Sequence, residues 1–213
     1  MPGIKKEFER VVVKSSNALE SWLSKNSSRE ESVWLVHGKK GQPDYVSRGE
    51  ILEQLLSYGW IDSLARKLDA THTMLLISPR RSRSSWSAVN KRIIERLVKE
   101  KRMKGPGLAK IVQAKKDGTW SHLDKVETLE IPKDLESTFK KYPKSKSFFL
   151  NFNRSSRRGI LEWINAAKQA ETRKVRVEKT AKLAGENIMA NHPKGRDKGK
   201  PLPSSSTRQS PRL

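Results

Sequence analysis

Apolar and polar positions in the first part of the chain follow patterns that predict a short helix and a buried strand. Within residues 17–26, Ala18, Trp22 and Leu23 lie near one helical face, which is typical of an amphipathic helix. Residues 32–37 place four apolar side chains, two of them β-branched, before a glycine-containing turn. We predict that this second segment is a strand buried in a sheet.

A second helix is predicted to begin after Ser47. Ser47 and Glu50 have the spacing of a capping box, in which each side chain bonds a backbone N–H group that the first helical turn leaves unpaired. The apolar residues that follow recur at helical spacing: Ile51, Leu52, Leu55 and Leu56. The helix is expected to end near Gly59, because glycine favours the backbone conformation that closes a helix.

Two antiparallel strands are predicted over residues 64–68 and 73–78. The polar residues 69–72 between them have the length of a connection that joins neighbouring antiparallel strands. Pro79 ends the second strand, because proline has no N–H group to donate to a ladder.

A pair of helices is predicted over residues 86–102 and 108–116, separated by the turn of residues 105–107. The apolar stripe expected to face the core in the first helix consists of Trp86, Val89, Ile93, Leu97 and Val98. The Gly-Pro-Gly turn before the second helix has two interpretations, an ordinary connection or a phosphate-binding helix N-terminus. It lacks the surrounding pattern of a P-loop or a dinucleotide fingerprint, which favours the connection.

The fold class expected from these elements is α+β, with helices packed on a small, mainly antiparallel sheet and followed by a C-terminal helical module. The module is expected because apolar residues recur at helical spacing beyond Ile131, whereas the last residues contain too few apolar side chains to offset the entropy of ordering. The expected organisation is an N-terminal extension (1–14), an α+β domain (15–118), a connector (119–130), a helical module (131–185) and a disordered basic tail (186–213).

Composition limits the compartment and the partners. The 213 residues include 45 Lys and Arg against 23 Asp and Glu, and the net charge of +22 favours encounters with polyanions. The mean hydropathy of −0.76, the absence of an apolar run long enough to span a membrane and the lack of a secretory h-region predict a soluble protein. We expect it in the cytoplasm, or in the nucleus if the chain is eukaryotic.

No catalytic or metal-binding signature is present, so we expect a binding protein without a cofactor. Cysteine is absent, which excludes disulfides, thiol nucleophiles and thiolate-bound metals. The four histidines, His37, His72, His122 and His192, are isolated from one another and lack metal-ligand spacing. An enzyme acting on a phosphorylated small molecule is a further alternative, but it requires a formed pocket with perturbed titratable groups.

Residues 58–63 and 78–90 concentrate polar and aromatic side chains that would suit a pocket for an anion or another small ligand. Arginine supplies planar donors, tryptophan supplies stacking faces, and the other polar groups orient a ligand. The candidate ligand-binding residues are Trp60, Asp62, Arg80, Arg81, Ser85, Trp86 and Asn90. The structural alternative is that the two tryptophans fill core and that Asp62 caps a helix or pairs with Arg80.

Basic residues on the later helices offer a second interpretation, non-specific binding to the phosphate backbone of a nucleic acid. The candidates are Arg92, Arg96, Lys99, Arg102, Arg154, Arg157, Arg158, Arg173, Lys174 and Arg176. Such binding would depend steeply on salt. A solvated helix surface is the alternative to this interpretation.

Several motifs in one order resemble the YdeI/OmpD-associated family, also called bacteriocin-protection proteins, over roughly residues 15–185. They are Gly59-Trp60-Ile61-Asp62, Ser78-Pro79-Arg80, Ser85-Trp86-Ser87 with Asn90, Arg102-Met103 with Gly107-Leu108, and Trp163-Ile164 with Ala167-Lys168 and Glu171-Thr172-Arg173. The chain departs from the family pattern at Ser63, where glycine is usual, and at Leu76, where arginine is common.

The resemblance implies a non-enzymatic stress-tolerance or protection protein that acts by binding a ligand or a protein. Family members are associated with envelope stress tolerance, with resistance to cationic peptides and with an outer-membrane porin. The implied partner is an envelope-associated protein, and the resemblance supplies no catalytic residues.

Overall fold

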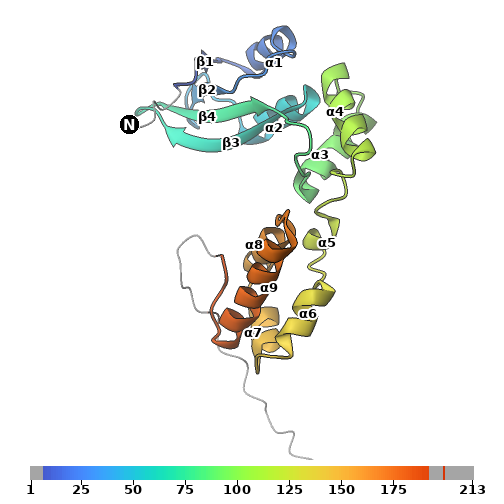
Figure 1. The fold of residues 1–213 in the computed structure, drawn as a ribbon. Helices are drawn as coiled ribbons and strands as arrows, with labels where there is room; N and C mark the ends of the chain where they lie inside the picture. Colours follow the sequence, from blue (N-terminus) through green and yellow to red (C-terminus); the bar gives the residue numbers. More distant parts are fainter. Residues whose placement is uncertain (1–6, 192–198, 200–213) are drawn as a thin grey trace, which may run out of the picture. The chain divides into compact units, whose positions relative to one another are not determined.

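The computed structural model describes residues 7–191 and residue 199 (Figure 1). The chain divides after Leu123 into an N-terminal unit, residues 1–123, and a C-terminal unit, residues 124–213. A mixed sheet with covering helices forms the first unit, and helices form the second. The predicted α+β class with a C-terminal helical module is therefore confirmed.

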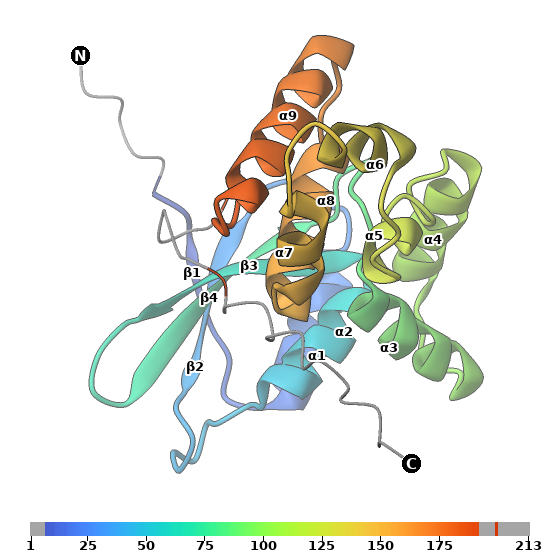
Figure 2. The ribbon, with the colours of Figure 1, turned by 90° about the horizontal axis from the view of Figure 1, so that it is seen from below.

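The four strands of the N-terminal unit form one sheet in the order β1-β2-β4-β3. The strands are β1 (Arg10–Val12), β2 (Val33–Gly38), β3 (Trp60–Lys67) and β4 (His72–Pro79). β1 runs parallel to β2, whereas β2 and β3 each pair antiparallel to β4, as Figure 2 shows for the β3–β4 hairpin. β1 lies in the segment expected to be an extension, where its three residues gave no period to detect.

Helices α1 (Ser16–Lys25) and α2 (Arg48–Ser57) each begin at a serine cap. The hydroxyl of Ser15 accepts from Ala18 N at 3.1 Å. The predicted capping box of α2 is present, since Ser47 Oγ accepts from Glu50 N and Glu50 Oε2 accepts from Ser47 N. Both helices start where side-chain acceptors replace the backbone partners that a first turn lacks.

A single apolar cluster joins these two helices to the sheet. Its buried members come from all four strands and both helices: Val11, Val13, Leu19, Leu23, Val33, Leu35, Val46, Ile51, Leu55, Tyr58, Trp60, Leu75 and Ile77. Along β4, Leu75 and Ile77 alternate with the partly exposed Leu76, which is the period of two expected of a strand. The sheet is thus held by the burial of one apolar face against α1 and α2.

Helices α3 (Ala88–Lys99) and α4 (Gly105–Lys116) follow the sheet and pack around a second apolar cluster. The apolar stripe predicted for α3 is partly wrong, because Val89 and Val98 are 52% and 49% exposed. Leu97 is buried as predicted, and Ile94, which was not in the predicted stripe, is buried as well. Trp86 is buried in the same cluster but precedes α3, so it does not belong to the helical stripe.

The C-terminal unit consists of helices with α9 packed against three of the others (Figure 1). The helices are α5 (Asp124–Glu127), α6 (Lys133–Phe139), α7 (Ser145–Asn151), α8 (Arg154–Asn165) and α9 (Ala170–Gly185). Phe149 lies between Phe139 and Phe152, with ring centroids 5.3 and 6.1 Å apart. α5 interrupts the segment expected to be a plain connector.

Most of the predicted basic tail, residues 192–198 and 200–213, lies outside the described residues. Among the residues that the structure describes, no helix has both the length and the apolar character needed to cross a membrane.

Helices α2 and α4 approach each other closely at Gly107. A Cβ atom at this position would lie 2.2 Å from the backbone oxygen of Ser57 and 2.8 Å from that of Leu56. Real Cβ atoms do not approach backbone oxygen to such distances, so the contact requires glycine. The backbone N–H of Lys104 also donates to Ser57 O at 3.2 Å, which fixes the start of α4 against the end of α2.

We expect Gly107→Ala to lower the free energy of unfolding by about 1–3 kcal/mol, because the added methyl group forces two helices apart. Gly105→Ala is the matched control in the same helix turn, since a Cβ there meets nothing within 4 Å. Urea denaturation of the two variants checks the prediction. Equal stability of both variants would contradict the close contact.

Candidate anion-binding site

The site begins where the end of β4 meets the start of β3. Trp60 and Pro79 are paired residues of the two strands, and the next backbone group, Arg80 N, donates to Gly59 O at 2.9 Å. Gly59 has a φ of +76°, a left-handed conformation that side chains disfavour and glycine allows. The two tryptophan-bearing stretches singled out in the sequence are therefore joined through their backbones.

The Arg80 side chain turns inward and stacks on Trp86. Its guanidinium carbon lies 3.6 Å from the Trp86 ring centroid, and its Nη2 donates to the backbone oxygen of Ser85 at 2.5 Å. Both side chains are almost fully buried, at 2% exposure each. Trp86 in turn packs against Trp120, with 5.2 Å between the ring centroids. A charged group is thus held within an aromatic cluster.

The positive charge of Arg80 has no carboxylate beside it within the described residues. Nε and Nη1 of the guanidinium are buried and lack a hydrogen-bond partner there. Burial lowers the pKa of Arg80 to about 10, so the group stays charged at neutral pH. A buried charge without an acidic partner is costly, and stacking on an indole offsets only a small part, about 2 kcal/mol.

Arg80 lines a small hollow of about 40 Å³ in the N-terminal unit. The walls come from the turn after β4 and from the end of α4 and the segment behind it: Arg80, Arg81, Ser82, Arg83, Ser84, Trp86, Lys110, Gln113, Ala114, Asp117 and Thr119. Four of these side chains are cationic and one is a carboxylate. Asp117 is engaged by Thr119, whose N and Oγ1 donate to its Oδ1, and these bonds lower the pKa of Asp117.

The predicted ligand residues divide into two groups. Arg80, Arg81 and Trp86 line the hollow, and Ser85 contacts Arg80 through its carbonyl. The other predicted residues do not line it.

Trp60 belongs to the sheet cluster, where its ring meets Trp22 edge to face at 5.4 Å. Asp62 accepts from Arg48 Nη2 at 2.5 Å and does not pair with Arg80. Asn90 lies in the first turn of α3, where its backbone N–H donates to Ser87 Oγ. Trp60, Asp62 and Asn90 therefore do not line this hollow, and their roles in ligand binding stay predictions.

Sequence reasoning missed Ser84 and Lys110 as residues of this site. Ser84 Oγ is buried and has no partner among residues 7–191 and 199, and Lys110 reaches the hollow from α4. Ser84 lies in a run of arginine and serine whose members look alike in sequence. Lys110 is one of many lysines, and only the packing of α4 against the end of the sheet distinguishes it.

Many of the basic residues predicted to bind a nucleic acid are engaged within the protein. Arg102 reaches Glu53 at 2.9 Å, and Arg96 pairs with the same carboxylate. In the C-terminal unit, Arg158 binds Glu127 and Glu162 at 2.9 and 2.8 Å. Arg173 binds Asp134, and Arg92, Arg154 and Arg176 donate to backbone oxygens.

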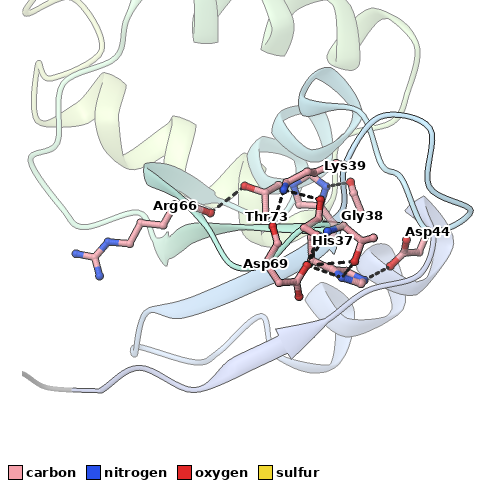
Figure 3. Close-up of polar contacts among 10 residues, drawn as sticks. His37, Gly38, Lys39, Asp44, Arg66, Asp69 and Thr73 are labelled. Carbon is pink, nitrogen blue, oxygen red and sulfur yellow. Dashed lines mark hydrogen bonds and ion pairs between the residues drawn. The ribbon is translucent and has the colours of Figure 1, made fainter.

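A second polar cluster, which we call the hairpin clasp, consists of Lys39, Asp44, Asp69 and His72, where the loop after β2 meets the turn of the β3–β4 hairpin. Figure 3 shows Lys39, Asp44 and Asp69 of this cluster. Lys39 Nζ donates to the backbone oxygens of Asp69 and Ala70 at 2.5 and 2.8 Å. His72 Nε2 lies 3.0 Å from Asp44 Oδ2. The clasp therefore ties the hairpin to the loop that follows β2.

Two groups near the tip have shifted pKa values. Backbone N–H groups of His72 and Thr71 donate to Asp69 Oδ1 at 2.7 and 2.8 Å and lower the pKa of Asp69 to about 2. Burial lowers the pKa of His37, which lies beside the clasp on β2, and its bond to Gly38 O opposes the shift in part.

Strand register brings two of the histidines that are isolated in sequence to the same end of the sheet, since His37 pairs with Thr73 and Gly38 with His72. Even so, the described part of the chain contains no group of three or more His, Cys, Asp or Glu that could hold a metal ion.

Asp69 is expected to stabilise the fold only above acidic pH. Its folded pKa of about 2 is below the ordinary 3.8, so its contribution is complete above pH 3.8 and is lost as the pH falls toward 2. Asp69→Asn keeps the acceptor but not the charge. We expect the stability difference between wild type and this variant, measured by urea unfolding, to shrink as the pH falls through this window.

Asp69→Ala serves as the comparison, because it removes the acceptor and should destabilise the fold at every pH. A deficit of Asp69→Asn that stays constant from neutral pH to about pH 2 would show that the carboxylate charge is not the origin of the effect.

Comparison with known proteins separates the two units. Residues 11–110 match the family model described as Domain of unknown function (DUF8412). Residues 128–187 match the model described as Bacteriocin-protection, YdeI or OmpD-Associated. No curated protein and no solved structure matches the chain. The resemblance seen in the sequence motifs is confirmed for residues 128–187 of the C-terminal helical unit, which match the YdeI/OmpD-associated family model.

Proposed function

We propose that the chain is a non-enzymatic protection protein that acts by binding, and that its N-terminal unit binds a small anion at Arg80. The observation that carries the proposal is the buried guanidinium with two unpartnered donor atoms at the wall of a hollow. The proposal assigns the anionic ligand to the N-terminal unit and leaves the YdeI/OmpD-associated domain for contact with a protein partner.

The energetic argument for an anion starts from the cost of the isolated charge. Removing a guanidinium from water costs several kcal/mol unless acceptors and negative charge surround it. The Ser85 carbonyl and the Trp86 ring supply part of this compensation. An anion in the hollow would supply the remainder, because its oxygens accept hydrogen bonds and its charge balances that of Arg80.

The family description supports a protective role rather than a reaction. The matched model is described as Bacteriocin-protection, YdeI or OmpD-Associated, which names protection and association and no reaction. Envelope association of this chain is part of the proposal, with a protein as the partner.

Nucleic-acid binding by the basic helices is a second candidate, favoured by the net charge of +22. The ion pairs of Arg96, Arg102, Arg158 and Arg173 argue against it, because a phosphate backbone would have to compete with carboxylates already in place. Only the basic residues without such ion pairs would then attract the phosphate backbone without competition.

Arg80→Met tests the anion site. We expect inorganic phosphate to raise the melting temperature of the wild type and to leave that of Arg80→Met unchanged. Without phosphate the variant should differ from wild type by about 1 kcal/mol or less, because the loss of stacking and of one hydrogen bond offsets relief of the buried charge.

Arg92→Met is the matched control for this measurement, since Arg92 is exposed on α3 and does not line the hollow. It should keep the phosphate response of the wild type at constant ionic strength. Equal responses of Arg80→Met and the wild type would remove Arg80 from any anion site.

A gel shift with generic duplex DNA at two salt concentrations addresses the second candidate. The proposal expects no retardation, whereas backbone binding would give retardation at about 50 mM salt that collapses by about 200 mM. Collapsing retardation would favour the nucleic-acid interpretation over the proposed function.

A further inference from the structure

We propose that the hollow beside Arg80 accepts a phosphoryl group, with Arg80, Ser84 and Lys110 as its ligands. This inference rests on the proposed anion site and names the chemical class of its ligand. The argument uses the donor set, the size of the hollow and the charge of its walls.

The buried donor atoms of Arg80 and Ser84 that lack a partner among the described residues suit a ligand that accepts hydrogen bonds. Arg80 Nε and Nη1 can only donate, and the hydroxyl of Ser84 can donate as well. These three buried atoms, which lack partners in the described part of the chain, belong to two residues that line the same hollow. A ligand with several acceptor oxygens on one atom meets this requirement, and a phosphoryl group has three.

The size of the hollow selects a compact group. Its volume is about 40 Å³, and because one water needs about 10–15 Å³ by this measure, the hollow holds roughly three water-sized positions. A tetrahedral oxyanion fills such a space, whereas drug-sized ligands occupy about 300 Å³ or more. Any larger ligand would insert its phosphoryl group and keep its remaining atoms outside the hollow.

The charge of the walls favours a dianion over a singly charged carboxylate. Arg81, Arg83 and Lys110 join Arg80 around the hollow, and the single carboxylate, Asp117, lies close enough to Arg83 for their charges to interact. A phosphate monoester carries about −1.5 to −2 at neutral pH. The exposed turn of Arg81, Ser82 and Arg83 forms the outer wall, so the entering group passes cationic side chains.

The test is isothermal titration of the full chain with inorganic phosphate, glycerol 3-phosphate and acetate at equal ionic strength. We expect phosphate to bind at least about tenfold more tightly than acetate, because it offers more acceptors and more charge to the same donors. If glycerol 3-phosphate binds as phosphate does, the site accepts a phosphate monoester as well as the free ion. If only phosphate binds, the ligand is the free ion, and both results support a phosphoryl site.

Two variants test the assignment of the walls. Ser84→Ala and Lys110→Met should each weaken phosphate binding on the order of tenfold, through loss of one hydrogen bond to a charged ligand. Lys116→Met is the control on the same helix, because Lys116 is exposed and does not line the hollow, and it should bind phosphate as the wild type does. Ser84→Ala removes one oxygen, so the test does not depend on the folding of an Arg80 variant.

The outcomes separate this inference from the proposed function. Equal binding of acetate and phosphate, lost in Arg80→Met, would overturn the phosphoryl class and leave the anion site in place. Unchanged phosphate binding in both Ser84→Ala and Lys110→Met would also overturn the inference. No binding of any of the three anions to the wild type would overturn both proposals.

Discussion

The stacking of the Arg80 guanidinium on the Trp86 ring is the contact on which the N-terminal unit depends for its chemistry. It holds a full positive charge at 2% exposure, in a place where apolar side chains would pack at lower cost. The same contact positions the turn after β4, because Nη2 of Arg80 binds the carbonyl of Ser85. The group that fixes the turn is thus also the buried charge for which we propose an anion.

Arg80 differs from the arginines that tie elements together through ion pairs, which occur in both units. In the C-terminal unit, Arg158 links the carboxylates of Glu127 and Glu162, and Arg173 binds Asp134 through two hydrogen bonds. These contacts join α8 to α5 and α9 to α6, so the guanidinium groups serve mainly as ties between helices. Arg80 lacks such a carboxylate among the described residues, and this difference marks it as a candidate functional group despite a sequence crowded with basic residues.

Local signals in the sequence were sufficient for much of the fold. The Ser47–Glu50 capping box is present, and the apolar run of residues 32–37 became β2 within one residue at each end, because both signals depend on near neighbours. β1 was not found, since three residues have no period and are ordered only by pairing with β2.

The site was predicted in part: Arg80, Arg81 and Trp86 lie in one chain segment, whereas Ser84 has no distinctive sequence context and Lys110 comes from a separate helix, α4. For Asp62 the structural alternative was a helix cap or a pair with Arg80, and the fold pairs it with Arg48 at the start of α2 instead.

Two residues without side chains set the spacing between the sheet and α4. A Cβ at Gly59 would lie 3.5 Å from the Cα of Gly107 and 2.9 Å from a carbon of Lys110, and Gly107 itself touches the end of α2. Because both residues carry only a hydrogen atom in place of a side chain, the part of α4 that bears Lys110 can lie close to the start of β3. If the proposed anion site exists, its preference can change through the exposed residues at the mouth of the hollow, in evolution or in redesign, whereas the two glycines restrict change on the side of α4.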